Sequence, residues 1–261
     1  MRTLALAACA VLASGVAQAD GTKVLAAGSL KAVFTRLGAQ YAEQGGSAPG
    51  FEFGPSGVLR DRIAGGAPAD VFASANMTHP QTFVDAGKAP SVIRFARNEL
   101  CLLSRPGLAL TPDNALDMLF RRDLKLGMST PKADPAGDYA VQMFERADKL
   151  RPGAGRALLA RAHQLTGGAD SPKPPDGRNV YAWVVDSGQA DVFVTYCTNT
   201  KLAQREVPAL QQTALPPSLA VGADYGLVVL SGPGSEGGKF AGFLQSAPAR
   251  KVLADEGFVL P

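Results

Sequence analysis

The sequence predicts an α/β protein made of two lobes of similar construction, each with a parallel sheet that helices cover. Short apolar segments are followed by tight turns of small residues and then by segments with helical periodicity. The same succession starts again past residue 120. The chain has 261 residues, 46% of them hydrophobic, which is enough for one large domain or for two of ordinary size.

The first half of the chain holds three expected strands and two expected helices. Residues 23–27, 50–53 and 70–73 are short apolar segments that read as buried strands. Small turn-forming residues end the first two strands. Helical periodicity follows each turn, over residues 29–41 and 58–63. Strand, turn and helix in this order predict parallel strands.

The second half repeats this order. Residues 124–128 are an expected strand, and helices are expected to begin at Pro135 and at Asn179. The segment Ala-Asp-Val-Phe occurs twice, at 69–72 and at 190–193, each time where a strand begins. One short repeat is weak evidence of duplication, but it fits two lobes of similar construction. By composition, residues 167–177 form a loop.

The N-terminus has the features of a secretory signal peptide. Arg2 supplies a positive charge, residues 4–16 are mostly apolar, and Ala17-Gln18-Ala19 is an Ala-x-Ala cleavage pattern. We therefore expect residues 1–19 to be a signal peptide that is cleaved after Ala19, and the protein to be exported to the periplasm. A lipid anchor at Cys9 is a minor alternative, because the apolar segment before it is short.

Composition excludes several classes of function. The net charge is only +3 and lysine and arginine do not cluster, so no nucleic-acid partner is expected. His79 and His163 are the only histidines and lack ligand-spaced partners, so we expect no metal site and place both at the surface or at a helix cap. In an exported protein Cys101 and Cys197 can form a disulfide or can be two separately buried thiols, and both alternatives stay open.

The sequence holds no convincing catalytic motif, so we expect a protein that is not an enzyme. Ser129 and Lys132 have the S-x-x-K spacing of serine acyl enzymes, but the accompanying motifs are absent and Pro131 would interrupt the required helix. A turn from strand to loop is expected there. A secreted hydrolase that uses Ser129 and Lys132 is the rival hypothesis.

Four expected helix starts form a pattern that suits an anion. Ser29, Ser56, Ala136 and Val180 lie at or beside these starts, two in each lobe, and a helix N-terminus offers free N–H groups and a positive dipole. Tyr196 follows the expected strand at 191–194, where open α/β sheets place ligand contacts. The alternatives are that Ser29 and Ser56 are simple N-caps and that Tyr196 only packs.

Several segments together resemble the periplasmic molybdate-binding proteins, the ligand receptors of molybdate ABC importers. The resemblance implies a type II periplasmic-binding-protein fold, with two α/β lobes joined by a hinge and the ligand cleft between them. It implies that residues 20–100 plus 220–261 form lobe 1 and that residues 101–219 form lobe 2. The segments that carry it are 26–30 (AAGSL), 65–75 (GGAPADVFASA), 96–100 (ARNEL), 134–140 (DPAGDYA) and 243–258, which opens with FLQS and closes with GF.

By matched position, the resemblance implies an oxyanion site in the cleft. It nominates the hydroxyls of Ser29, Ser56 and Tyr196 and the backbone N–H groups of Ala136 and Val180. The implied ligand is molybdate or tungstate, with no cofactor, no metal cation and no covalent chemistry. The implied partner is the membrane permease of an ABC importer, and a monomer is expected.

The ligand also has alternatives. The chain departs from the family pattern at residues 54–57, 76–79 and 197–199, so sulfate, phosphate or a small organic anion stays open. Asp134 and Asp138 flank the Pro135-Ala136-Gly137 turn. If either faces the cleft, an anion that carries a proton, such as hydrogen phosphate, is favoured. If both face solvent, they only favour the helix start.

Overall fold

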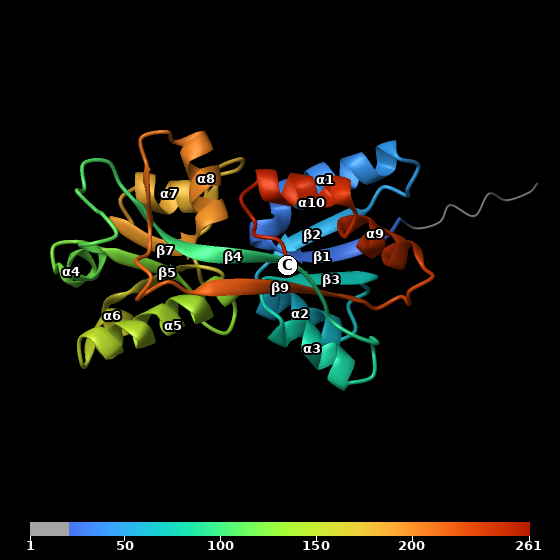
Figure 1. The fold of residues 1–261 in the computed structure, drawn as a ribbon, viewed down its shortest axis with the longest axis horizontal. Helices are drawn as coiled ribbons and strands as arrows, with labels where there is room; N and C mark the ends of the chain where they lie inside the picture. Colours follow the sequence, from blue (N-terminus) through green and yellow to red (C-terminus); the bar gives the residue numbers. More distant parts are fainter. Residues whose placement is uncertain (1–20) are drawn as a thin grey trace, which may run out of the picture.

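The computed structural model describes residues 21–261 and shows two α/β lobes side by side along the long axis of the molecule (Figure 1). The expected signal peptide and Cys9 lie outside the described residues. In the described part of the chain, nine strands form one sheet in the order β2-β1-β3-β9-β4-β7-β5-β6, with β8 paired to β4. The strands are β1 (Lys23–Ala27), β2 (Gly50–Gly54), β3 (Val71–Ser74), β4 (Ile93–Ser104), β5 (Leu126–Ser129), β6 (His163–Thr166), β7 (Val192–Tyr196), β8 (Gln211–Ala214) and β9 (Gly222–Val229).

The expected parallel pairing is present at the outer part of each lobe. Strand β1 is parallel to β2 and β3, and β5 is parallel to β6 and β7. The middle of the sheet differs from the expectation, because β4, β8 and β9 pair with their neighbours in antiparallel fashion. Residues 93–99 of β4 pair with β9 in the first lobe, and residues 100–104 pair with β7 and β8 in the second. Strand β4 therefore connects the two lobes.

Helices cover both faces of each half of the sheet (Figure 1). In the first lobe α1, α9 and α10 lie on one face, with α2 and α3 on the other. In the second, α7 and α8 lie opposite α5 and α6. No helix among residues 21–261 has both the length and the apolar character needed to cross a bilayer. The helices are α1 (Lys31–Glu43), α2 (Ser56–Ala64), α3 (Thr78–Asp85), α4 (Ala115–Phe120), α5 (Pro135–Leu150), α6 (Ala154–Arg161), α7 (Val180–Asp186), α8 (Cys197–Glu206), α9 (Glu236–Leu244) and α10 (Ala247–Asp255), and a 3-10 turn, η1 (Gly28–Leu30), precedes α1.

An aromatic cluster holds the first lobe together. Phe34 of α1 packs against Phe51 of β2, Phe95 of β4 and Phe240 of α9, with ring centroids 5.8–6.2 Å apart. Phe34 lies on the face of α1 that helical periodicity predicts to be buried. Because Phe240 comes from the C-terminal part of the chain, the end of the sequence packs into the lobe where the sequence begins.

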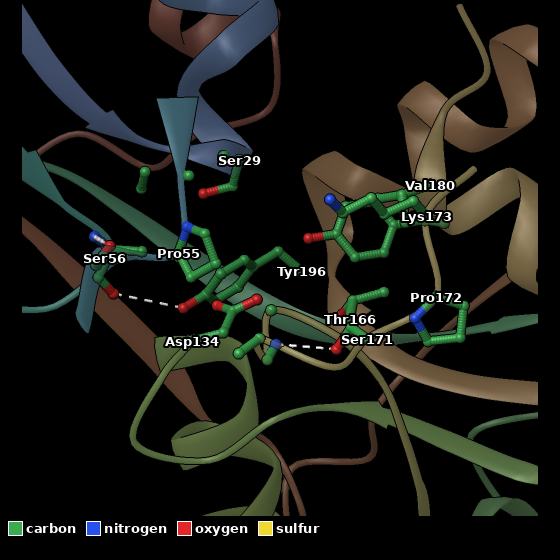
Figure 2. A pocket seen from close by; sticks show the side chains of 18 residues that line it. Ser29, Pro55, Ser56, Asp134, Thr166, Ser171, Pro172, Lys173, Val180 and Tyr196 are labelled. Atoms are coloured by element: carbon green, nitrogen blue, oxygen red, sulfur yellow. Dashed lines mark hydrogen bonds between the residues drawn. The ribbon is translucent and has the colours of Figure 1, made fainter. Parts of the chain in front are cut away.

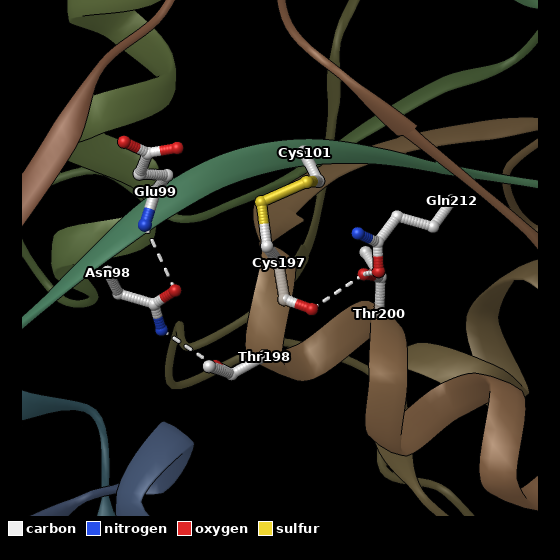
Figure 3. Close-up of a disulfide and its surroundings, with 7 residues drawn as sticks. All are labelled: Asn98, Glu99, Cys101, Cys197, Thr198, Thr200 and Gln212. Carbon is white, nitrogen blue, oxygen red and sulfur yellow. Dashed lines mark hydrogen bonds between the residues drawn. A yellow bond between two sulfur atoms is a disulfide. The ribbon is translucent and has the colours of Figure 1, made fainter. Parts of the chain in front are cut away.

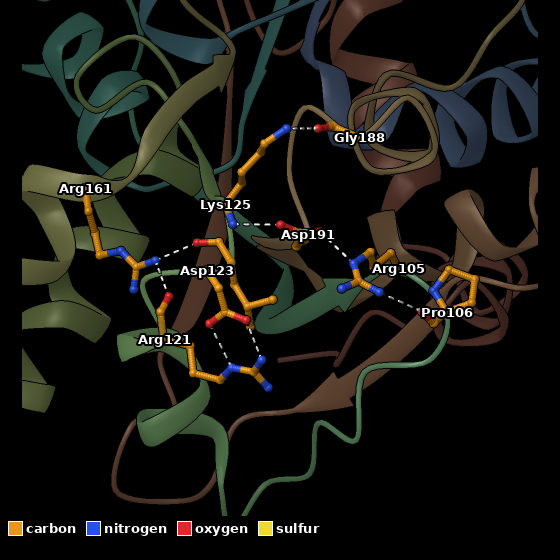
Figure 4. A network of polar contacts seen from close by, with 9 residues as sticks. Arg105, Pro106, Arg121, Asp123, Lys125, Arg161, Gly188 and Asp191 are labelled. Carbon is orange, nitrogen blue, oxygen red and sulfur yellow. Dashed lines mark hydrogen bonds and ion pairs between the residues drawn. The ribbon is translucent and has the colours of Figure 1, made fainter.

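The repeated Ala-Asp-Val-Phe segment builds the same local structure in both lobes. The carboxylate of Asp70 accepts a hydrogen bond from the N–H of Lys23, at 2.7 Å, and the N–H of Asp70 donates to the Lys23 carbonyl at 2.8 Å. Asp191 makes the same two bonds with Lys125, each at 2.8 Å (Figure 4). Each aspartate thus ties the start of its strand to the start of a neighbouring strand. Arg105 adds an ion pair to Asp191 at 2.6 Å.

A disulfide crosses from β4 to α8 near the junction of the lobes (Figure 3). Cys101 and Cys197 are bonded, with their Cα atoms 4.9 Å apart, which decides between the two alternatives for these cysteines. Beside it, the side-chain amide of Asn98 donates to the Thr198 hydroxyl at 2.7 Å. The first turn of α8 is therefore fixed to β4 directly after Tyr196, the residue expected in the ligand cleft.

Candidate functional site

A cavity of about 250 Å³ lies between the lobes, and both lobes line it (Figure 2). Its walls come from the segments that follow the carboxyl ends of parallel strands, where open α/β sheets usually bind ligands. The first lobe contributes Ala27–Ser29, Gly54–Ser56 and Ala75. The second lobe contributes Asp134, residues 166–169, Ser171–Lys173, Val180, Tyr181 and Tyr196.

The two lobes touch each other beside this cavity. The N–H of Gly57, in the first turn of α2, donates to the carbonyl of Ala133 in the other lobe at 3.0 Å. The hydroxyl of Tyr196 donates to the carbonyl of Ala75 at 3.4 Å. An ideal Cβ built on Gly57 would lie 2.4 Å from the carbonyl oxygen of Lys132, so only glycine fits at this contact. The structure is therefore a closed form of the cleft.

Ser29 and Ser56 lie on the first-lobe wall, and both are buried. The alternative that they are N-caps is wrong, because Ala27 and Pro55 occupy the cap positions and neither helix start has a side-chain cap. The Ser29 hydroxyl shares a 2.9 Å hydrogen bond with the Tyr225 hydroxyl. The Ser56 hydroxyl accepts from the N–H of Ala75 at 3.2 Å. Since it accepts there, its proton is available to a molecule in the cavity.

Tyr196 ends β7 and is 1% exposed. Burial raises the pKa of its hydroxyl well above the usual value, so the group stays neutral and can donate. The same cause raises the pKa of Tyr225, whose hydroxyl also receives the Asn98 amide at 3.4 Å. The neutral Tyr225 hydroxyl and Asn98 amide are therefore connected by hydrogen bonds to Ser29, which lines the cavity.

The two helix starts of the second lobe differ from each other. Val180 lines the cavity, and the side chain of Asn179 takes the N–H groups of Tyr181 and Ala182 but not that of Val180. Ala136 is not among the lining residues, and its N–H donates to the Asp134 carboxylate at 3.0 Å. At this helix start the cap residue Asp134, rather than the Ala136 backbone, lies against the cavity.

Asp134 faces the cleft (Figure 2), whereas Asp138 is not among the residues that line it. The interpretation that both face solvent is therefore wrong for Asp134. Burial raises the pKa of its carboxyl, and the hydrogen bond from Ala136 offsets this only in part. Gly167 packs onto Asp134: its ideal Cβ would lie 2.5 Å from the Asp134 Cβ, and its φ of +81° also favours glycine. Asp138 instead accepts from the N–H of Lys132 at 2.7 Å.

Sequence reasoning missed the contribution of the loop at residues 167–177. This loop brings Ser171 and Lys173 to the cavity, and Lys173 is an exposed cation on its rim. Within the loop, the Ser171 hydroxyl accepts from the N–H of Gly168 at 2.9 Å (Figure 2). The adjacent glycines 167 and 168 were the available signal, because paired glycines mark a backbone that approaches another element closely.

The other candidate residues do not form a second reactive site. Ser129 is buried at the end of β5 and shares a 2.7 Å hydrogen bond with Thr166, while Lys132 is an exposed turn residue with φ of 67°. His163 is exposed, as expected. His79 is buried, contrary to expectation, and its Nδ1 lies 3.1 Å from a guanidinium nitrogen of Arg60. Within residues 21–261 no three His, Cys, Asp or Glu side chains are grouped to hold a metal ion.

Two lobes that close over a cavity with donors on both walls, and with no grouped catalytic side chains among the described residues, are typical of a binding protein. The chain belongs to the family of bacterial extracellular solute-binding proteins, whose family model matches residues 22–259. It is therefore an extracytoplasmic solute-binding protein of the ABC-importer type rather than an enzyme. Such a protein needs no cofactor and delivers its solute to a membrane permease.

The relatives and structural neighbours agree with this assignment. An uncharacterized protein of Pasteurella multocida, PM1146, is 39% identical over 68% of this chain and 74% of its own. The molybdate-binding protein ModA of Azotobacter vinelandii is 31% identical over 64% of this chain and 69% of its own. Among solved structures, the periplasmic molybdate-binding protein of Azotobacter vinelandii superposes with a TM-score of 0.73 at 22% identity, over 92% of this chain and 99% of its own. The sulfate-binding protein SubI of Mycobacterium tuberculosis has a TM-score of 0.72 at 20% identity, over 92% and 86%. These likenesses establish the type II periplasmic-binding-protein fold.

Proposed function

We propose that this protein captures molybdate or tungstate in the cleft between its lobes and delivers the anion to the permease of an ABC importer. One observation carries the proposal. Ser29, Ser56, Val180 and Tyr196, which the sequence nominates from four separate segments, line a single closed cavity. The relative that is named a molybdate-binding protein, at 31% identity, supports this choice of anion.

The chemistry of the wall suits a tetrahedral oxyanion. The hydroxyls of Ser29 and Ser56 and the N–H of Val180 are neutral donors that approach the cavity from both lobes. The Tyr196 hydroxyl, whose proton points to the Ala75 carbonyl in this structure, is a further neutral donor when it turns to the anion. Neutral donors hold an anion without forming a permanent ion pair, which favours release of the anion to the permease. Because the donors are divided between the lobes, a bound anion favours the closed form over the open one.

A second candidate is an anion other than molybdate, and three observations favour it. Asp134 adds an acceptor and Lys173 a cation to the wall. The cavity of about 250 Å³ has room for roughly eight waters at about 30 Å³ each, more than a bare tetrahedral oxyanion fills. A small organic anion with a hydroxyl or a protonated oxygen would use this space and the Asp134 acceptor. Sulfate and phosphate are the inorganic members of this alternative.

We further propose that the protein acts in the periplasm as a monomer, after removal of residues 1–19. The proposed lobes are residues 20–100 plus 220–261 and residues 101–219. The change of partner strands within β4 between residues 99 and 100 supports the first of these boundaries. Mass spectrometry of the exported protein would test cleavage after Ala19, and light scattering would test the monomer.

Calorimetric titration of the purified protein with molybdate, tungstate, sulfate and phosphate in parallel tests the proposal. We expect tight binding of molybdate and tungstate and no heat of binding from the other two. Binding of phosphate or sulfate instead would establish the second candidate. If none of the four anions binds, a panel of small organic anions, with and without hydroxyl groups, decides whether the cleft takes a larger cargo.

A further inference from the structure

The carboxylate of Asp134 lies on the wall of a cleft that we propose binds an anion, and the hydrogen-bond donors of the site do not explain why a negative charge is placed there. Asp134 points into the cavity (Figure 2), while one of its oxygens, Oδ1, accepts from the N–H of Ala136 at 3.0 Å. Gly167 covers the other side of the same side chain. The carboxylate therefore cannot turn away from the cavity without losing its cap and displacing the loop that Gly167 begins.

Capping of α5 does not by itself require a charge at this position. The other helix start on the same side of the cleft, α7, is capped by Asn179, whose amide oxygen takes two N–H groups at 3.0 Å. Asparagine and aspartate are about equally good N-caps. The carboxyl group at Asp134 thus offers something that an amide would not, which is the ability to gain and lose a proton.

We propose that binding of a deprotonated oxyanion in this cleft takes up one proton, which is held between the Asp134 carboxyl and an oxygen of the anion. The proton comes from solvent and adds to the Asp134 carboxylate, and no bond of the anion is broken. This inference rests on the proposed function, since it requires that the cleft bind an oxyanion.

The physical reason is the repulsion between two anions in a closed, water-poor space. A charged carboxylate beside a bound oxyanion is unfavourable, because the low dielectric of a closed cleft weakens screening. A protonated carboxyl removes this repulsion and becomes a donor, so the whole wall then presents donors to the anion. Burial already raises the pKa of the Asp134 carboxyl, so the neutral form is accessible before the anion adds its own negative charge.

Among the titratable groups in and around the cavity, Asp134 is the one that we expect to take up the proton. Asp138 on the same helix raises the pKa of Asp134 further. The tyrosines that face it, Tyr181 of α7, Tyr196 of β7 and Tyr225 of β9, have raised pKa values and stay neutral. Among the described residues that line the cavity the one cation is Lys173, an exposed side chain whose charge solvent screens.

Calorimetry with molybdate tests the proposal directly. Between about pH 6 and 8 molybdate carries no proton of its own, and uptake of one proton by the protein lowers its affinity by about tenfold per pH unit. Titrations in two buffers of different ionisation enthalpy count the protons, and about one is expected per anion. In Asp134→Asn the helix cap is kept, and we expect a flat pH profile and no proton uptake.

Asp138→Asn is the matched control, because Asp138 lies one turn further along α5 and is not among the cavity-lining residues. It should keep the tenfold slope per pH unit and the uptake of one proton, although loss of the Asp138 charge lowers the pKa of Asp134 and shifts the pH range in which the slope is seen. If molybdate binds with no proton uptake and a flat profile, the inference is overturned while the proposed function stands. A pH slope that persists in Asp134→Asn also overturns it, since the proton is then elsewhere. If none of molybdate, tungstate, sulfate and phosphate binds to the parent, the oxyanion assignment and this inference fall together.

Discussion

Replacement of Gly57 by alanine should hold the cleft open. In the closed form the added Cβ would lie 2.4 Å from the Lys132 carbonyl oxygen and 3.0 Å from that of Ala133. Ordinary contact begins near 3.4 Å, so the lobes must separate by about 1 Å. That movement stretches the bond from the Gly57 N–H to Ala133, now 3.0 Å, beyond hydrogen-bond range.

We expect Gly57→Ala to weaken binding of the anion rather than to lower the stability of the free protein. A buried donor left without its partner costs about 1–3 kcal/mol, which corresponds to a loss of affinity of roughly 5- to 150-fold. If the cleft is open in the free protein, the clash is absent there. Gly57 lies in α2, where alanine is the better helix former by about 1 kcal/mol, so the melting temperature of the free protein should stay constant or rise.

Calorimetric affinity and thermal melting of the free protein, measured together, check this prediction. Gly242→Ala is the matched control, since Gly242 also lies in a helix and its added Cβ would meet nothing within 4 Å. A Gly57→Ala protein that melts several degrees lower but binds the anion with parent affinity would refute the reasoning. That result would mean that the contact with Ala133 is permanent and that the cleft does not open.

Three further predictions concern the wall, the disulfide and the alkaline limit of stability. Ser29→Ala and Ser56→Ala should each weaken anion binding by about 1–3 kcal/mol, the cost of losing a hydrogen bond to a charged group, as measured by calorimetry. Ser218→Ala, at an exposed position outside the cavity, should leave the affinity unchanged. Unchanged affinity in both the Ser29 and the Ser56 variant would remove these residues from the site. Serine at both disulfide positions should lower the free energy of unfolding by about 2–5 kcal/mol, because the bridge closes a 96-residue span of chain, and denaturant curves with equal midpoints would contradict this. Burial raises the pKa of Tyr139 to about 12 from an ordinary value near 10, so its share of stability is present below pH 10 and is lost as the pH rises to about 12. Tyr139→Phe should flatten this part of the stability–pH curve, and an unaltered curve would argue against it.

Turn residues and hydrophobic periodicity were sufficient to predict the strands and helices whose formation depends on residues nearby in the sequence. Strands β1 and β5 and the helices that follow Gly54 and Asp134 lie where turn residues and periodicity place them. The antiparallel strands in the middle of the sheet, β4, β8 and β9, were not foreseen. Strand β9 pairs with β3 and β4 from more than 120 residues away, and no short window of sequence contains that information.

The residues of the candidate site also fall into those that local sequence predicted and those that it could not. Ser29 and Ser56 follow directly from turns after strands, and the structure places both on one wall. For the Asp134 side chain the sequence left two orientations open, toward the cleft or toward solvent. The choice between them depends on how the loop that begins at Gly167 lies over this side chain. Lys173 could not be found, since a charged residue in a proline-rich loop has no periodicity or cap that fixes its place.

The order of strands has a consequence for how this protein leaves the cell interior. Strand β9 lies between β3 and β4, so the sheet of the first lobe lacks a central member until residues 222–229 are available. During synthesis the first hundred residues of the chain therefore cannot complete their own lobe. We therefore expect a chain in this condition to stay loosely structured during export and to finish folding only after its C-terminal part has also left the cytoplasm.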